Sequence, residues 1–71
     1  MKWTSVKHLP ECNESVIICY NLGSEKAPFY RYAIGQLLES KKKFMYLDGT
    51  VDVHKVVAWM SFPKYNNNIN D

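Results

Sequence analysis

The longest uninterrupted apolar block of the chain follows Lys55 and ends at Pro63. It is rich in β-branched and aromatic residues, which favour strands, and its proline cannot donate to a sheet ladder. Strand alternation gives one face Val56, Ala58, Met60 and Phe62, and the other face Val57, Trp59 and Ser61. Both faces are therefore apolar and need cover, which predicts that residues 55–62 form the central strand of a sheet.

Two further apolar runs predict strands. Residues 15–20 read Ser-Val-Ile-Ile-Cys-Tyr and are apolar on both faces. Residues 43–48 contain Phe-Met-Tyr-Leu and end at the start of an Asp-Gly pair, which is typical of hairpin turns. Residues 21–28 hold the glycine, serine and proline of a connecting loop. Residues 50–54 are expected to bridge to the central strand.

Residues 29–38 fit two structures. The opening aromatic residues and Gly35 favour a strand, because glycine is costly inside a helix. A helix over residues 28–41 is supported by Pro28, a good first helical residue, and by apolar spacing. The positions with helical spacing are Tyr30, Ala33, Ile34, Leu37, Leu38 and Lys41. The residue pattern alone leaves both structures open.

The two ends of the chain have different characters. Trp3, Val6 and Leu9 are spaced three apart before Pro10, which predicts a short N-terminal arm packed on the sheet with Trp3 near Trp59. Residues 64–71 are rich in asparagine and offer almost nothing to bury. We therefore expect one small domain over residues 1–63 and a flexible tail over residues 64–71.

Motifs at both ends resemble those of a family of short phage and prophage proteins, the domain of unknown function 551. The opening motif is Trp3, Ser5, Val6, Lys7, Leu9 and Pro10, and the closing motif is Val57 to Pro63. Between them the Val-Ile strand of the family is matched by Val16 to Ile18, and its hairpin by Ala33 to Leu38 and Phe44 to Leu47. The chain departs from the family at Ser61, usually proline, at Phe62, usually leucine, and at Ala58, often histidine. The resemblance implies a phage origin and favours a strand at residues 29–38, while the family has no agreed activity.

These patterns together predict an all-β or β-rich fold. The expected sheet is small, twisted and antiparallel, with about four strands at residues 15–20, 29–38, 43–48 and 55–62 and the N-terminal arm packed on it. The expected core is Trp3, Val16, Ile18, Val57, Trp59 and Met60. The alternative is an α+β fold, in which a helix at about residues 28–41 covers a three-stranded antiparallel sheet.

Composition narrows the class of protein. The chain has 71 residues, a net charge of +2 and 23% charged residues, which is an ordinary balance and gives no electrostatic argument for nucleic acid. Two cysteines are few for a secreted disulfide scaffold, and no leader or membrane-length apolar segment is evident. We expect reduced thiols, no membrane association and a location in the cytoplasm of a bacterial host.

The residues with reactive side chains are not arranged for chemistry. Those able to bind zinc or act as nucleophile and base are His8, Cys12, Cys19 and His54, and they lack the short spacing of zinc knuckles. The carboxylate pairs are Glu11 with Glu14 and Asp48 with Asp52, and both pairs lie in expected turns. The chain is also short for a substrate cleft. We therefore predict no catalytic residue, metal or cofactor, and no enzymatic activity.

Aromatic and basic residues alternate in two places. Tyr30, Arg31 and Tyr32 form one group, and Lys41, Lys42 and Lys43 precede Tyr46 in the other. A sheet that shows stacking platforms beside phosphate-binding groups binds single-stranded nucleic acid, so this is one candidate function. The same residues are equally typical of cross-strand pairs and a solvated turn.

A role in protein binding is the first functional hypothesis. The double-sided apolar strands leave a surplus of large side chains, which suits either an exposed interaction patch or a homodimer interface. By analogy with phage accessory proteins, the expected partner is a host or phage protein, and the expected role is inhibition of a host enzyme or defence system. The candidate surface is the set Tyr30, Arg31, Tyr32, Lys41, Lys42, Lys43 and Tyr46.

Overall fold

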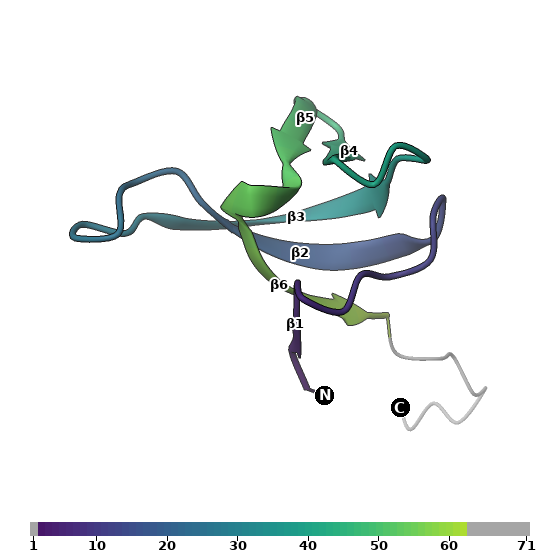
Figure 1. Cartoon of the computed structure of the whole chain (residues 1–71), viewed down its shortest axis with the longest axis horizontal. Helices are drawn as coiled ribbons and strands as arrows, with labels where there is room; N and C mark the ends of the chain where they lie inside the picture. The colour runs from purple at the N-terminus through teal and green to yellow at the C-terminus, as the bar shows by residue number, and fades with distance from the viewer. Residues whose placement is uncertain (1, 63–71) are drawn as a thin grey trace, which may run out of the picture.

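The computed structural model describes residues 2–62, which form one antiparallel sheet of six strands with a single short 3-10 turn (Figure 1). The strands are β1 (Thr4–Ser5), β2 (Ser15–Asn21), β3 (Tyr30–Leu37), β4 (Lys43–Tyr46), β5 (Gly49–Asp52) and β6 (Val56–Ser61). The 3-10 turn η1 (Val53–Lys55) joins β5 to β6. The prediction of an all-β fold is confirmed, and the alternative helix at residues 28–41 is wrong because β3 occupies most of that range.

The strand order is β1-β6-β2-β3-β4-β5. The predicted central strand is β6, which lies between β1 and β2 and therefore has neighbours on both sides. Its place in the order is second, however, and its outer neighbour β1 has only two residues. The centre of the sheet is the long β2–β3 hairpin, in which seven residue pairs are in register from Ser15 opposite Gln36 to Asn21 opposite Tyr30.

Two strands were not predicted. Residues 49–52, expected as the end of a turn and the start of a bridge at residues 50–54, form β5 and pair with β4 through a tight hairpin. Gly49 permits that hairpin, because its φ of +139° is a backbone conformation that side chains disfavour. In the N-terminal arm, Thr4 and Ser5 pair with Trp59 and Ala58 of β6. The sheet therefore has six strands rather than about four.

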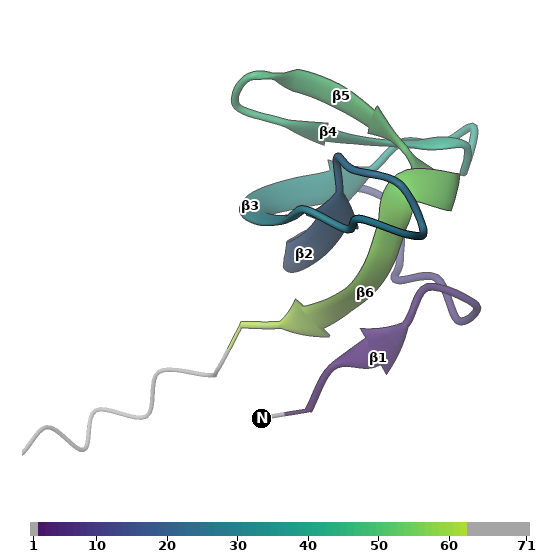
Figure 2. The same ribbon diagram turned by 90° about the vertical axis from the view of Figure 1, so that its left-hand side faces the viewer.

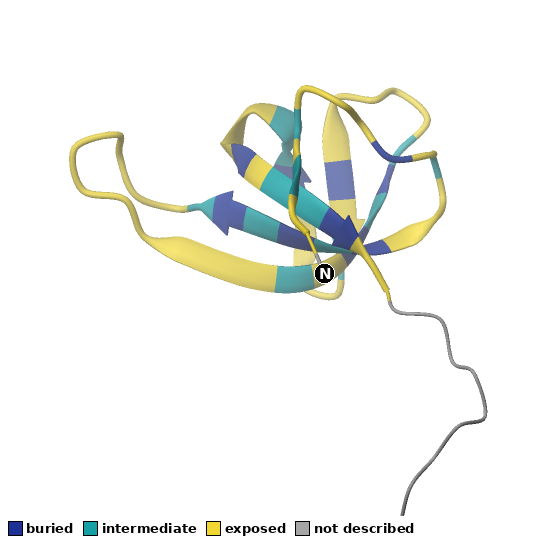
Figure 3. Ribbon diagram, turned by 90° about the horizontal axis from the view of Figure 1, so that it is seen from below, coloured by how far each residue is buried: buried dark blue, intermediate teal, exposed yellow. Residues whose placement is uncertain are grey.

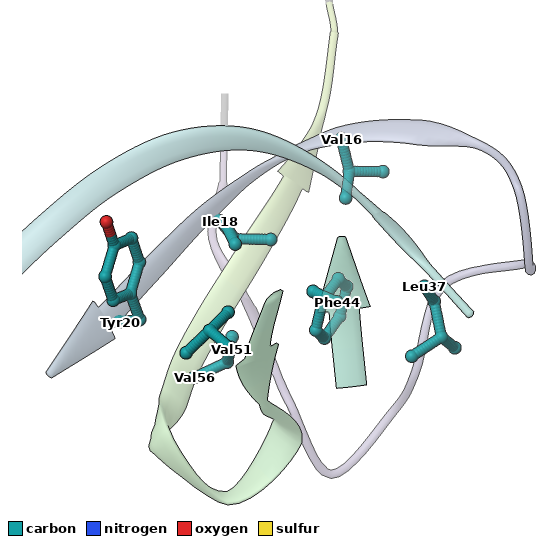
Figure 4. Packing of buried hydrophobic residues seen from close by; sticks show 7 residues of the cluster. All are labelled: Val16, Ile18, Tyr20, Leu37, Phe44, Val51 and Val56. Carbon is teal, nitrogen blue, oxygen red and sulfur yellow. The ribbon is translucent and has the colours of Figure 1, made fainter. Parts of the chain in front are cut away.

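The sheet curls around its own core, so that the β4–β5 hairpin faces across to β6 (Figure 2). The buried side chains of the core cluster come from five strands and lie on one face of the sheet, which we call the core face (Figure 4). They are Val16, Ile18, Tyr20, Leu37, Phe44, Val51 and Val56. We call the opposite side of the sheet the outer face. A single sheet thus buries one of its faces with no helix in residues 2–62 to cover it.

A bulge in β6 changes which residues face the core. Tyr20 lies opposite Val56, whereas Cys19 lies opposite Ala58, so Val57 is the extra residue. Beyond the bulge Trp59 lies opposite Ile18, and it packs against the core. Simple alternation had placed Val56 and Trp59 on different faces. Because of the bulge, Val56 and Trp59 both lie on the core face, and Met60 lies on the outer face.

The predicted core is confirmed for Val16, Ile18 and Met60, which are buried. Trp59 is half-buried and packs on the core. The prediction is wrong for Val57, which is 46% exposed because it is the bulge residue, and for Trp3, which is 45% exposed. Trp3 precedes the Thr4–Trp59 pair, so its side chain lies on the face opposite to Trp59.

The N-terminal arm does pack on the sheet, as predicted. The Trp59 indole Nε1 donates a hydrogen bond to the carbonyl of His8 at 2.7 Å, and the Val6 amide donates to the Val57 carbonyl at 3.3 Å. The predicted flexible tail at residues 64–71 and the domain boundary at residue 63 lie outside the described residues. Within residues 2–62, no helix has the length and apolar character needed to cross a membrane.

Candidate protein interface

The outer face of the sheet is largely apolar, and within residues 2–62 no other layer covers it. β2, β3 and β6 contain a single charged residue, Arg31, and it lies on the core side because it pairs with Tyr20. The apolar outer-face residues of these strands and their neighbours are Trp3, Ile17, Cys19, Tyr30, Tyr32, Ile34, Met45, Ala58 and Met60, and the polar ones of β2 and β3 are Ser15, Asn21 and Gln36. The exposed apolar members are Trp3, Tyr30, Tyr32, Ile34 and Met45, whereas Met60 is only 8% exposed. An exposed apolar area of this kind marks an interaction site more often than it marks an ordinary surface.

Cross-strand pairing makes this face continuous. Ile34 lies opposite Ile17, which lies opposite Met60. In the next row, Tyr32 lies opposite Cys19, which lies opposite Ala58. Directly opposite side chains in an antiparallel sheet are in contact, so each row is an unbroken strip across three strands.

The most exposed part of the face is on β3. Tyr32 and Ile34 are 64% and 60% exposed, and Tyr30 is 48% exposed. Figure 3 shows this half of the strand continuing into the exposed β2–β3 loop. Because a fully buried aromatic side chain covers about 150–250 Å², each of these tyrosines leaves on the order of 100 Å² of mostly apolar surface in water.

Trp3 builds a shallow hollow into the face. Its ring lies 6.1 Å from the ring of Tyr32, centroid to centroid, across the small side chains of Cys19 and Ala58. Together with Tyr30 and Val57, these residues line a hollow of about 250 Å³. A ring-lined hollow within an apolar face is the form in which protein interfaces receive an anchoring side chain.

The structure divides the predicted interaction surface into four parts. Tyr30 and Tyr32 lie on the outer face, whereas Arg31 lies on the other side of β3, with its guanidinium 5.8 Å from the Phe29 ring. Lys41, Lys42 and Lys43 follow the far end of β3, roughly 23 Å from Tyr30 at the usual strand rise. Tyr46 is half-buried on the core face, 5.6 Å from Tyr20. The aromatic and basic groups are therefore not brought together.

Charge is confined to the margins of the outer face. Lys43 forms an ion pair with Asp52 at 3.7 Å, in the corner of the sheet made by β4 and β5. Both side chains are well exposed, so the pair contributes little stability. The basic residue next to Tyr30 and Tyr32 in sequence is Arg31, and its side chain lies on the other side of β3, which argues against phosphate binding at the outer face.

The reactive side chains do not form a site. Among the described residues, no group of three or more His, Cys, Asp or Glu side chains is placed to hold a metal ion. Cys19 lies within the apolar strip, and burial raises the pKa of its thiol, with a smaller opposing effect from a hydrogen bond to Tyr32. A thiol with a raised pKa is a poor nucleophile at neutral pH, so Cys19 contributes apolar contact rather than reactivity.

Sequence reasoning missed three of the exposed members of the face: Trp3, which was assigned to the core, and Ile34 and Met45, which were not assigned to a surface. One signal was present, because Tyr30, Tyr32 and Ile34 alternate along one predicted strand. Alternation groups residues on a face, but it does not say which face another part of the chain will cover. A scan against protein-family models found no matching family, and searches of curated proteins and of solved structures found no match.

Proposed function

We propose that this chain is a small protein-interaction module, and that its outer face binds an apolar surface of another protein. The observation that carries the proposal is the exposure of Tyr32 and Ile34 on a sheet face to which β2, β3 and β6 contribute no charged residue. The exposed rings and aliphatic groups of this face amount to several hundred Å², while a standard interface covers about 800 Å² on each partner. The face therefore provides the apolar centre of such an interface.

The phage origin suggested by the terminal motifs points to a partner in a bacterial cytoplasm. On this proposal the chain inhibits a host enzyme or defence system by covering a surface that the host protein needs. No reaction is required of the module, since a bound partner is blocked by occupation alone. The aromatic residues Trp3, Tyr30 and Tyr32 supply rigid contact area with little loss of side-chain entropy on binding.

The test uses two matched substitutions. Ile34→Lys places a charge in the outer face, and Leu9→Lys places the same charge at another exposed aliphatic residue, beside Pro10 and Cys12. We expect Ile34→Lys to reduce capture of the partner from a bacterial lysate at least about tenfold, because the interface would have to bury an unpaired charge. Leu9→Lys is expected to capture the partner as the wild type does. Equal capture by both variants contradicts the proposal.

Titration with a labelled single-stranded oligonucleotide tests whether the partner is a nucleic acid instead of a protein. Ile34→Lys adds a cation beside Tyr32, so it would strengthen phosphate binding while it weakens an apolar protein contact. Salt-sensitive oligonucleotide binding by the wild type that is further strengthened by Ile34→Lys would indicate that the partner is a nucleic acid and not a protein. Sedimentation equilibrium of the wild type identifies a second copy of the chain as the occupant if a dimer forms and Ile34→Lys dissociates it.

A further inference from the structure

One edge of β3 has no neighbouring strand over much of its length. β2 pairs with β3 from Asn21–Tyr30 to Ser15–Gln36, whereas β4 pairs only with Gly35, Gln36 and Leu37. The other edge of β3 is therefore unpaired from Tyr30 to Ile34 within residues 2–62. We call this stretch the open edge.

Hydrogen bonds at both ends of β3 show which main-chain groups point out from the open edge. The Leu22 amide donates to the Phe29 carbonyl at 2.9 Å, so Phe29 and, by alternation, Arg31 and Ala33 turn their main-chain groups toward β2. The Leu38 amide donates to the Lys43 carbonyl at 3.0 Å, on the side of β4. Both hydrogen bonds indicate that odd-numbered residues of β3 direct their main-chain groups toward β2 and even-numbered residues direct theirs to the side of β4. The amides and carbonyls of Tyr30, Tyr32 and Ile34 therefore point outward from the open edge.

The open edge has little of the protection that is usual for exposed strands. Natural edges are blunted by proline, by charged side chains, by bulges or by a covering loop. Residues 30–34 read Tyr-Arg-Tyr-Ala-Ile and contain no proline or lysine, their pairing with β2 has no bulge, and their one charged residue is Arg31 on the core side. The outward main-chain groups and the exposed side chains of the outer face belong to the same three residues.

The surroundings of the open edge define what fits there. Ile34, Met45 and Leu47 line one side of a hollow of about 280 Å³ where β4 ends alongside β3, so an apolar side chain suits that end. On the core side, the exposed Arg31 forms no ion pair with any residue of the described chain. An acidic side chain across from Arg31 would complete a charged pair.

We propose that the open edge binds an extended segment of the partner protein as an added strand. The segment carries apolar residues at every second position on the outer-face side and an acidic residue opposite Arg31. Three outward amides and three outward carbonyls of β3 supply the main-chain hydrogen bonds. The apolar side chains of the bound segment lie on the same side of the sheet as the outer face and extend it. This inference rests on the proposed function, since it names the form in which the partner reaches the same surface.

Amide hydrogen exchange followed by nuclear magnetic resonance tests the open edge in the free protein. We expect the amides of Tyr30, Tyr32 and Ile34 to exchange at least about tenfold faster than those of Arg31 and Ala33, which bond to β2. Uniformly slow exchange over residues 30–34 would mean that the edge is already covered, and it overturns the inference.

A linear random-peptide library, selected on the full-length chain, supplies the probe. We expect enriched peptides with alternating apolar residues and an acidic position, and we expect them to slow exchange at Tyr32 and Ile34 at least about tenfold. Arg31→Glu should reverse the preference at the acidic position to a basic one. Failure to enrich any peptide overturns strand addition, as does binding without protection of these amides.

Two substitutions at one residue separate main-chain from side-chain binding. Tyr32→Ser removes the ring, while Tyr32→Pro also removes the outward amide and leaves the bonds to β2 in place. We expect Tyr32→Pro to bind the selected peptides at least about tenfold more weakly than Tyr32→Ser. Equal binding contradicts strand addition. If Ile34→Lys still loses the partner in that case, the outer-face proposal stands without it, and if Ile34→Lys keeps the partner, both proposals fail.

Discussion

The two faces of the sheet contain the same kinds of apolar residue, but one face is buried and the other is exposed. On the core face of β2, Val16 and Ile18 are fully buried and Tyr20 is 6% exposed. On the outer face of the adjoining strand, Tyr32 and Ile34 are more than half exposed. Curling of the sheet covers one face only, because residues 2–62 contain no further element that covers the other. Apolar residues therefore form the core on one side of the sheet and the proposed interface on the other.

The largest difference between the faces should appear at two adjacent residues of β4. Phe44 is fully buried in the core, and Met45 is 47% exposed on the outer face. We expect Phe44→Ala to lower the free energy of unfolding by about 3–5 kcal/mol, because it leaves a cavity in a small core. Met45→Ala should cost less than about 1 kcal/mol. Urea unfolding followed by circular dichroism measures both, and similar losses would show that the two faces are not distinct.

A smaller effect is expected where the core face is most crowded. A Cβ added at Gly35 would lie 3.1 Å from the Met45 carbonyl oxygen and 3.3 Å from Cδ1 of Ile18. Gly35→Val should therefore lower the free energy of unfolding by about 1–3 kcal/mol, although valine favours strands. Thermal unfolding checks this value. An increase in stability would mean that the curl of the sheet does not depend on the missing side chain.

The pH dependence of stability gives the smallest expected difference. Burial raises the pKa of the Tyr20 phenol above 10.0, and the hydrogen bond to Tyr46 raises it further. The folded state thus holds this proton more tightly than the unfolded state, so its stabilising effect is full below about pH 10 and is lost as the pH rises through the folded pKa. Tyr20→Phe should flatten this alkaline loss in urea unfolding series. Parallel curves for the wild type and Tyr20→Phe contradict it.

Strands could be predicted where a short run of apolar residues between turn residues is enough to identify them. Residues 15–20, 29–38, 43–48 and 55–62 each contain an observed strand, because β-branched and aromatic runs between turn residues depend little on the rest of the chain. The β4–β5 hairpin was predicted only in part, although the Asp48-Gly49 pair marked its turn. The short alternating segment at residues 49–52 has one buried residue, Val51, and so gives a weak signal.

The order of the strands in the sheet and the bulge in β6 could not be predicted from local patterns. Residues 55–62 look central in sequence because both faces are apolar, yet β6 lies near one side of the sheet. Its second apolar face is covered only in part, by Trp3 from the N-terminal arm. The bulge at Val57 left no signal in the sequence, and it reversed the phase of the strand beyond that point.

The candidate site was predicted for Tyr30 and Tyr32 and missed for the residues around them. Alternation of aromatic and basic residues suggested a mixed surface, but successive residues of a strand face opposite sides, so Arg31 is separated from both tyrosines. The lysines are separated by the length of β3. Long-range pairing, which composition does not reveal, brings Trp3 to Tyr32 instead.

The placement of the two tryptophans supplies an optical readout for each side of the molecule. Trp3 is half exposed next to Tyr32, while the indole of Trp59 packs on the core and is hydrogen-bonded to the arm. A chain that keeps only Trp3 would report docking through its emission, and one that keeps only Trp59 would report unfolding. Fluorescence can thus follow recognition and folding as separate events in one small protein.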